Sequence, residues 1–151
     1  IAGLLHDPIE DPKVPYAEIE GDFGRHVADL VAGVTEEKER GEEKLPWRER
    51  KEGQLAHFQS AEPEILALKA ADTLHNVRSI LQDLRIHGNH VWARFNAPPE
   101  EQVWYYSSVA EAIAARLGRK GLPGELVQAV KELKDKSRVK KRKVESWEQK
   151  D

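Results

Sequence analysis

A short acidic stretch near the start of the chain combines side chains that can bind a metal ion or carry a proton. The run His6-Asp7-Pro8-Ile9-Glu10-Asp11 holds one imidazole and three carboxylates within six residues. It overlaps the end of the apolar segment that begins at Ile1, which predicts the last turns of a buried helix that ends at Pro8. An imidazole with carboxylates suits a divalent ion such as Mn²⁺, with Fe²⁺ or Zn²⁺ as alternatives. The stretch therefore predicts a metal site at a helix end.

A second polar pair interrupts the strongest apolar pattern of the chain. Leucine and valine recur at helical spacing over residues 63–84, which predicts a largely buried helix. Asp72 and Asn76 are four residues apart and therefore share one face of that helix. A buried carboxylate needs a positive partner, which is either a basic side chain or the metal ion of the first stretch. In the second case Asp72 is the distant ligand, and Glu10 and Asp11 orient or deprotonate water.

The composition limits the classes of protein to consider. The 151 residues allow one compact domain, and helical periodicity with few alternating patterns predicts an all-α fold. A net charge of −3 argues against bulk binding to nucleic acid, and the lack of cysteine excludes disulfides and thiolate ligands. No apolar stretch is long enough to cross a membrane and no secretory signal is visible, so we expect a cytoplasmic protein. The missing methionine and the apolar start predict a fragment without its true N-terminus.

The elements that must position these residues follow from apolar spacing, glycine and proline. Helices are expected at about 15–22, from Gly24 to about 36, and at 46–60, 63–84, 97–117 and 125–134, with a short turn at 91–95. The charged segment 36–44 predicts a solvated loop. Beyond Ser137 the chain is basic without an apolar stripe, which predicts a frayed helix or disorder. We therefore divide the chain into a domain at 1–118 and a C-terminal helix with a basic tail at 119–151.

At these residues the sequence resembles the HD-domain phosphohydrolases, and more closely the small alarmone (guanosine tetraphosphate, ppGpp) hydrolases of the Rel/Spo type. The resemblance runs in order from residue 1 to about 117, which is most of the chain. His6-Asp7 alone is a weak signal, but an acidic pair at this spacing followed by Ala71-Asp72-Thr73-Leu74-His75-Asn76 is specific. The matching stretches are Leu4–Asp11, Phe23–Val31 with Gly33-Val34-Thr35, Lys44–Lys51 and Lys69–Arg78.

The resemblance implies an all-helical HD bundle that binds one Mn²⁺ and removes the 3′-pyrophosphate from a guanosine polyphosphate. It assigns His6, Asp7 and Asp72 as metal ligands and Glu10 and Asp11 as the water-activating pair. The family's first ligand histidine lies upstream of the HD pair, on a helix that this sequence does not contain. The fragment alone is therefore expected to bind metal poorly and can be inactive. Pro8 and Pro12 also depart from the family's usual residues around the acidic pair.

Three residues are assigned weaker roles at the substrate. Asn76 is a candidate contact near substrate or metal, and Lys69 and Arg78 are basic residues that could reach a phosphate. The alternatives to an alarmone hydrolase are a broader nucleotide phosphohydrolase and a degenerate HD domain that binds a nucleotide without cleaving it. The basic tail could contact nucleic acid, but a terminal charge run is usually only solvated.

Two structural expectations follow from the metal assignment. The side chains of His6, Asp7 and Asp72 should converge closely enough to share one ion, with Glu10 and Asp11 at the rim of the same cleft. If helices are missing at the start of the domain, a large apolar area should be exposed near Ile1, Leu4 and Leu5.

Overall fold

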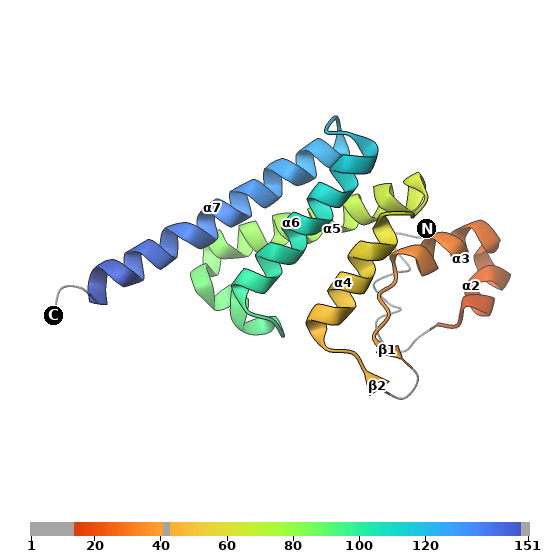
Figure 1. The fold of residues 1–151 in the computed structure, drawn as a ribbon, viewed down its shortest axis with the longest axis horizontal. Helices are drawn as coiled ribbons and strands as arrows, with labels where there is room; N and C mark the ends of the chain where they lie inside the picture. Colours follow the sequence, from red (N-terminus) through yellow and green to blue (C-terminus); the bar gives the residue numbers. More distant parts are fainter. Residues whose placement is uncertain (1–13, 41–42, 149–151) are drawn as a thin grey trace. The chain divides into compact units, whose positions relative to one another are not determined.

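The computed structural model describes residues 14–40 and 43–148, with side chains at 14–38 and 43–137. The chain divides into two compact units, residues 1–72 and 73–151, and the boundary falls inside one long helix. The helices and strands in chain order (Figure 1) are α2 (Tyr16–Phe23), α3 (Arg25–Val34), β1 (Glu39–Arg40), β2 (Glu43–Lys44), α4 (Trp47–Phe58), α5 (Pro63–His87), the 3₁₀ helix η2 (Gly88–Arg94), α6 (Pro99–Leu117) and α7 (Leu122–Glu148). The all-α prediction is confirmed, with one two-stranded hairpin added.

A tight helical hairpin begins the described part of the first unit. Gly24 separates α2 from α3 with φ +85°, a backbone conformation that favours glycine because it has no Cβ. Its amide donates to the Glu20 carbonyl at 2.9 Å and so closes the end of α2. Ile19 of α2 packs with Ala28 and Val31 of α3, and Leu68 of α5 lies against this cluster. The hairpin and the first part of α5 therefore share one apolar core.

Helix α4 holds the C-terminal end of α3 through a buried side chain. The Gln54 Nε2 donates to the Val34 carbonyl at 3.1 Å, which satisfies a backbone acceptor at the helix end. Thr35 leaves the helical conformation, and its hydroxyl donates to the Val31 carbonyl at 2.7 Å. The helix α3 therefore ends before Glu36. Between α3 and α4 we expected a loop, but β1 and β2 form a short antiparallel pair there, with Glu39 opposite Lys44.

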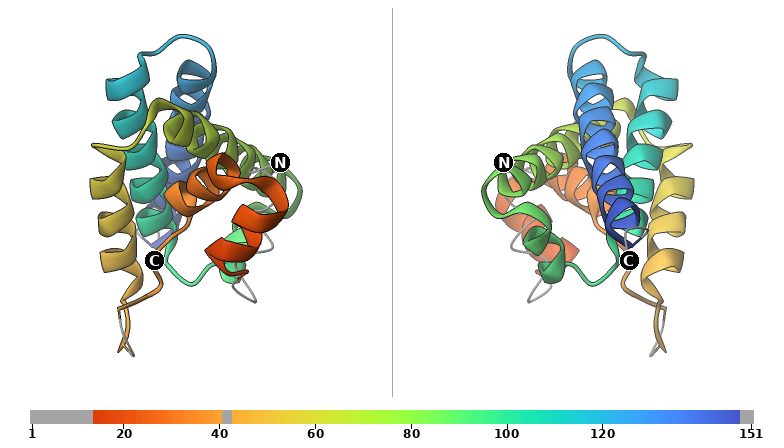
Figure 2. Two further views of the ribbon diagram at one scale, coloured as in Figure 1. Left: turned by 90° about the vertical axis from the view of Figure 1, so that its right-hand side faces the viewer. Right: turned by 90° about the vertical axis from the view of Figure 1, so that its left-hand side faces the viewer.

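The second unit combines the end of α5 with η2, α6 and α7. Helices α6 and α7 follow each other through a short turn and pack as an antiparallel pair, which Figure 2 shows from two sides. The ion pairs Arg78–Glu125 at 2.8 Å and Arg85–Glu132 at 3.1 Å join α5 to α7. Because both pairs span the same sequence separation, α5 and α7 run parallel. The fully buried side chains of this unit include Val77, Ile80, Val109, Ile113, Leu126 and Leu133.

The sequence predicted a shorter terminal helix and a division of the chain at residue 118. The terminal helix begins at Leu122 and continues to Glu148, where a helix ending near Lys134 and then a frayed helix or disorder were expected. The proposed division at residue 118 stays a prediction. Within residues 14–40 and 43–148, no helix is long and apolar enough to cross a membrane. The expected apolar exposure near Ile1, Leu4 and Leu5 lies outside the described residues.

Candidate functional site

Asp72 is the one predicted metal ligand within the described residues, and it is largely buried. Its side chain on α5 is 11% exposed, and its Oδ2 accepts a hydrogen bond from the Lys69 Nζ at 3.0 Å. The two residues are three apart on the helix and therefore share a face. The ammonium of Lys69, itself only 12% exposed, is a positive partner that a buried carboxylate needs. Asp72 does not point to solvent, which is the outcome that would have removed it from a metal site.

A second group of buried charges lies in the same unit and centres on Glu36. The Lys51 Nζ donates to Glu36 Oε2 at 2.9 Å. The Arg50 Nη1 lies 3.2 Å from Glu36 Oε1, as an ion pair without the geometry of a hydrogen bond. Glu36 follows directly after α3 and its side chain is 11% exposed, while both cations come from the first turns of α4. Lys51 also lies over the Trp47 ring, 5.7 Å from its centroid. These contacts fix a lysine that would otherwise extend into solvent.

The surroundings of Lys51 lower its pKa. Burial lowers the pKa of Lys51, and the positive charges of Lys69 and Arg50 lower it further, against the opposing effect of its bond to Glu36. Glu36, Arg50 and Lys51 therefore form one group of largely buried charges, where water screens them poorly.

The remaining predicted site residues divide into two sets. His6, Asp7, Glu10 and Asp11 lie outside the described residues, so their convergence with Asp72 stays a prediction. Asn76 is exposed on α5. Arg78 pairs with Glu125 of α7, an interaction within the second unit. In the described part of the chain, no three histidine or acidic side chains are grouped so that they could hold a metal ion.

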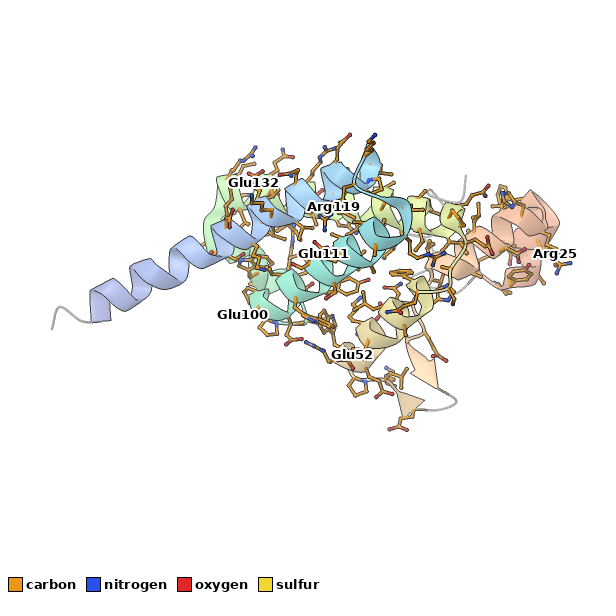
Figure 3. The ribbon with its side chains drawn as sticks, turned by 45° about the horizontal axis from the view of Figure 1, so that its top comes forward. Arg25, Glu52, Glu100, Glu111, Arg119 and Glu132 are labelled. Atoms are coloured by element: carbon orange, nitrogen blue, oxygen red, sulfur yellow. The ribbon has the colours of Figure 1, made fainter. Side chains whose placement is uncertain are left out.

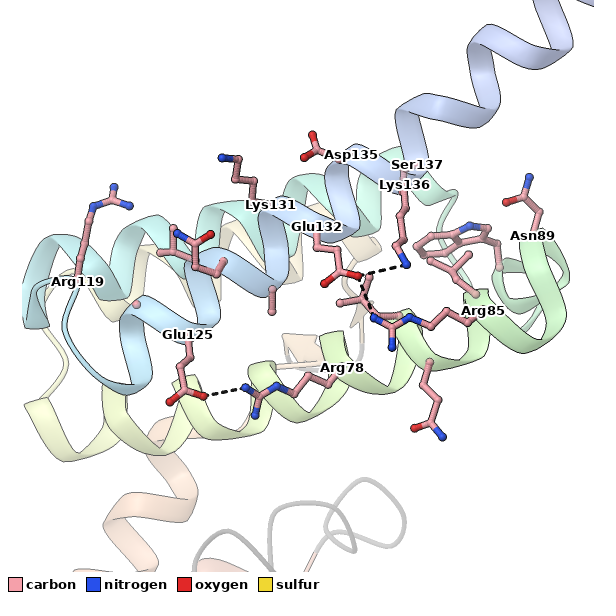
Figure 4. Close-up of a pocket in the computed structure, with 18 of the residues that line it drawn as sticks. Arg78, Arg85, Asn89, Arg119, Glu125, Lys131, Glu132, Asp135, Lys136 and Ser137 are labelled. Carbon is pink, nitrogen blue, oxygen red and sulfur yellow. Dashed lines mark hydrogen bonds and ion pairs between the residues drawn. The ribbon is translucent and has the colours of Figure 1, made fainter.

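The second unit contains an open groove of about 1470 Å³ between α5 and α7 (Figure 4). Cations and carboxylates alternate along it, and the pairs Arg78–Glu125 and Arg85–Glu132 bridge the two helices. The Lys136 and Arg85 hydrogen bonds hold the pKa of Glu132 below its ordinary value. These side chains are well exposed, so the groove is best explained as a solvated, ion-paired helix interface.

Nothing in the sequence marks Glu36, Arg50 or Lys51 as buried charges. Arg50 and Lys51 stood only in the stretch Lys44–Lys51 that supports the family resemblance. Glu36 was placed at the start of a solvated loop. Charged residues in a charged segment carry no sign of burial, and only the packing of α3 against α4 reveals them.

The fold and the buried carboxylate of α5 agree with the comparison with known families. Residues 1–102 match the family described as HD domain, and the chain belongs to this family. Among characterised proteins it is similar to the guanosine-3′,5′-bis(diphosphate) 3′-pyrophosphohydrolase MESH1 of Danio rerio, with 38% identity over 79 residues. It is also similar to the bifunctional (p)ppGpp synthase/hydrolase SpoT of Escherichia coli K12, with 36% identity over 86 residues.

These similarities cover only part of the relatives. The matched segments take in 52% of this chain and 41% of MESH1, and 53% of this chain and 12% of SpoT. A crystal structure of lmo0812 from Listeria monocytogenes EGD-e is similar over more of its length. It matches with a TM-score of 0.75 and 33% sequence identity, over 87% of this chain and 80% of that one. The HD-domain fold is therefore shown over most of the chain.

Proposed function

We propose that this chain provides the hydrolase domain of a metal-dependent pyrophosphohydrolase that acts on a guanosine polyphosphate. The observation that carries the proposal is the HD-domain match over residues 1–102, in a chain whose relatives MESH1 and SpoT are named for this substrate. The largely buried position of Asp72 is compatible with it, because a carboxylate there needs a cation nearby, which is Lys69 in this structure. The reaction adds water to the phosphorus on the 3′-oxygen and releases pyrophosphate.

The donor set of this chain fits a divalent ion. His6, Asp7 and Asp72 would hold it, and an imidazole with two carboxylates suits Mn²⁺. Asp72 meets the requirement for a ligand with restricted motion, since it lies within α5 and its side chain is bound to Lys69. When bound, such an ion lowers the pKa of water and polarises a phosphoryl oxygen. Lys69 neutralises the carboxylate in the protein without the ion.

The other residues of the site act on water and on the substrate. Glu10 and Asp11 orient the attacking water and accept its proton. Lys69 is the best supported phosphate contact, because its ammonium already lies beside Asp72. Asn76, exposed on α5, is a candidate contact with the nucleotide or the ion. Arg78 is a weaker candidate, since it is engaged with Glu125.

The direct test is hydrolysis of guanosine tetraphosphate by the full-length protein with and without Mn²⁺. We expect metal-dependent release of pyrophosphate, and loss of at least about a hundredfold in kcat for Asp72→Asn. A matched control is Asp83→Asn, which removes a carboxylate paired with Arg94 elsewhere on α5. Metal-dependent turnover that survives Asp72→Asn would contradict the ligand role. Nucleotide binding without turnover would instead support a degenerate HD domain, and equal turnover of unrelated nucleotides would support a broader phosphohydrolase.

A further inference from the structure

The last turns of α7 differ from the part of this helix that packs in the second unit. The earlier part has a stripe of buried side chains at helical spacing, formed by Leu126, Val130 and Leu133. Continued at the same spacing, that stripe reaches Ser137 and then Lys140, which are not apolar. The helix nevertheless continues to Glu148, and Figure 1 and Figure 3 show this end of α7 running on past α6. A buried apolar stripe therefore does not account for the last turns of α7.

Residues 138–144, which we call the basic segment, concentrate positive charge. Five of the seven residues are Arg or Lys and none is acidic, so the segment carries +5 while the rest of the chain carries −8. Only two acidic residues, Asp135 and Glu145, stand three or four positions from any of these cations. Lys140 and Lys143 have no acidic residue at either spacing. The small net charge of the whole chain therefore hides a strongly basic end.

The cations of the basic segment occupy two opposite sides of the helix. With about 100° between successive residues, Lys140 and Lys143 share one side. Arg138, Lys141 and Arg142 share the other side, about 180° away. Like charges three or four residues apart on a helix repel one another. This part of α7 is therefore stabilised when anions lie along both of its sides.

Two charged sides favour one kind of polyanion. A membrane surface meets one side of a helix and takes up an apolar face, whereas Val139 and Val144 are about 140° apart around the helix. The major groove of B-form DNA is about 12 Å wide and admits a helix about 10–12 Å in diameter between two rows of phosphates. The major groove of a double-stranded RNA is too deep and narrow for this. The charge pattern and the helix together therefore fit double-stranded DNA.

We infer that the basic segment of α7 binds double-stranded DNA by lying in the major groove, with the cations of its two sides on phosphates of the two strands. Contacts to phosphates carry no sequence information, so this binding does not select a sequence. The inference is independent of the proposed function, since the basic segment contains none of the residues assigned to hydrolysis. The acidic remainder of the chain repels DNA and confines the contact to this end of α7.

The salt dependence of DNA binding counts the cations that take part. Fluorescence anisotropy with the full-length protein and a labelled duplex of about 20 base pairs measures the affinity. Five phosphate contacts predict a loss of affinity of about 500-fold between about 50 and 200 mM salt. Replacing two of them, by Lys140→Gln with Lys143→Gln, should reduce this loss to about 40-fold. The conservative pair Lys140→Arg with Lys143→Arg should keep the full salt dependence.

Two further variants separate the position of the charges and the role of the helix. Lys131→Gln with Lys134→Gln removes the same charge from two exposed lysines earlier in α7 and should leave the salt dependence unchanged. Val139→Pro keeps all five cations but breaks the helix, and should weaken binding at least about tenfold. Thermal unfolding reports whether each variant folds, and we expect no change because the buried stripe ends at Leu133. If Val139→Pro does not fold, the lysine variants still make the comparison.

Failure of the unsubstituted protein to bind the duplex would overturn the inference. So would a salt dependence that Lys140→Gln with Lys143→Gln leaves unchanged, or that the control pair reduces as much. Equal affinity for a single strand of the same length, or full binding by Val139→Pro, would overturn the helix in the groove. Binding to phosphatidylserine vesicles without binding to the duplex would overturn it in favour of a membrane surface.

Hydrolysis of guanosine tetraphosphate, measured in parallel, separates this inference from the proposed function. The rate should be the same in the unsubstituted protein and in Lys140→Gln with Lys143→Gln. If hydrolysis is absent but the DNA results hold, the proposed function fails and the DNA-binding segment stands.

Discussion

Replacing Asp72 by asparagine tests the central carboxylate of α5 by its effect on stability as well as on activity. In the metal-free protein, Asp72 accepts a hydrogen bond from Lys69 at 3.0 Å, and the two side chains are 11% and 12% exposed. The substitution keeps the size of the side chain and removes its charge. It leaves the ammonium of Lys69 in a poorly solvated place with a weaker partner.

The magnitude follows from the burial of the pair. Removing one partner of a fully buried ion pair costs about 3–5 kcal/mol. Some access to water and the remaining amide oxygen reduce this loss, so we expect about 2 kcal/mol in the free energy of unfolding. With a urea m-value of about 2 kcal/mol/M for a chain of this size, the midpoint falls by about 1 M. A divalent ion that binds only the folded state adds stability according to its concentration and affinity.

Urea unfolding in chelator and thermal unfolding with added Mn²⁺ measure the two effects separately. Mn²⁺ should raise the melting temperature of the unsubstituted protein and have little effect on Asp72→Asn. The control Asp83→Asn breaks a more exposed pair with Arg94 and should cost less than about 1 kcal/mol, with the response to Mn²⁺ kept. Equal stabilisation of Asp72→Asn by Mn²⁺ would refute the metal assignment. A loss no larger than that of the control would refute the energetic argument for the Lys69 pair.

Three further predictions concern the first unit. A Cβ at Gly33 would lie 2.8 Å from Ile65 Cγ1, so Gly33→Ala should lower the free energy of unfolding by about 1–3 kcal/mol. A Cβ at Gly53 would meet nothing within 4 Å, so Gly53→Ala should raise it by about 0.5–1 kcal/mol, and urea unfolding measures both. Phe58 is fully buried, and Phe58→Ala should cost about 3–5 kcal/mol in the same assay; a loss below 1 kcal/mol would contradict its core position. The pKa of Lys51 is lowered from 10.5, mainly by burial, so the folded state binds this proton less tightly than the unfolded state. The free energy of unfolding should therefore rise with pH between the folded pKa of Lys51 and 10.5. This rise should be larger in the unsubstituted protein than in Lys51→Met. Parallel pH profiles of the two proteins would contradict this.

Most of the helical elements could be predicted from local patterns. Apolar spacing predicted the helix over 63–84, and its buried side chains at Leu66, Leu74 and Val77 are confirmed. Glycine and proline correctly predicted breaks such as that at Gly24. The predictions for the end of α3 and for the length of α7 were less accurate. Thr35 adopts an extended conformation, so α3 ends at Val34 before Glu36, and a basic sequence without an apolar stripe continues as helix to Glu148.

The sequence by itself determined the class of the protein, because its HD and ADTLHN stretches resemble those of HD domains, the family that matches residues 1–102. It also determined that Asp72 lies in an apolar helix, since the surrounding leucines and valines require burial. Only the tertiary structure decided which cation meets that carboxylate and which charged residues are buried. Glu36 and Lys51 are 15 residues apart, and nothing local distinguishes them from solvated charges. They meet because α4 packs against the end of α3, and pairing between distant side chains depends on that packing and not on local propensity.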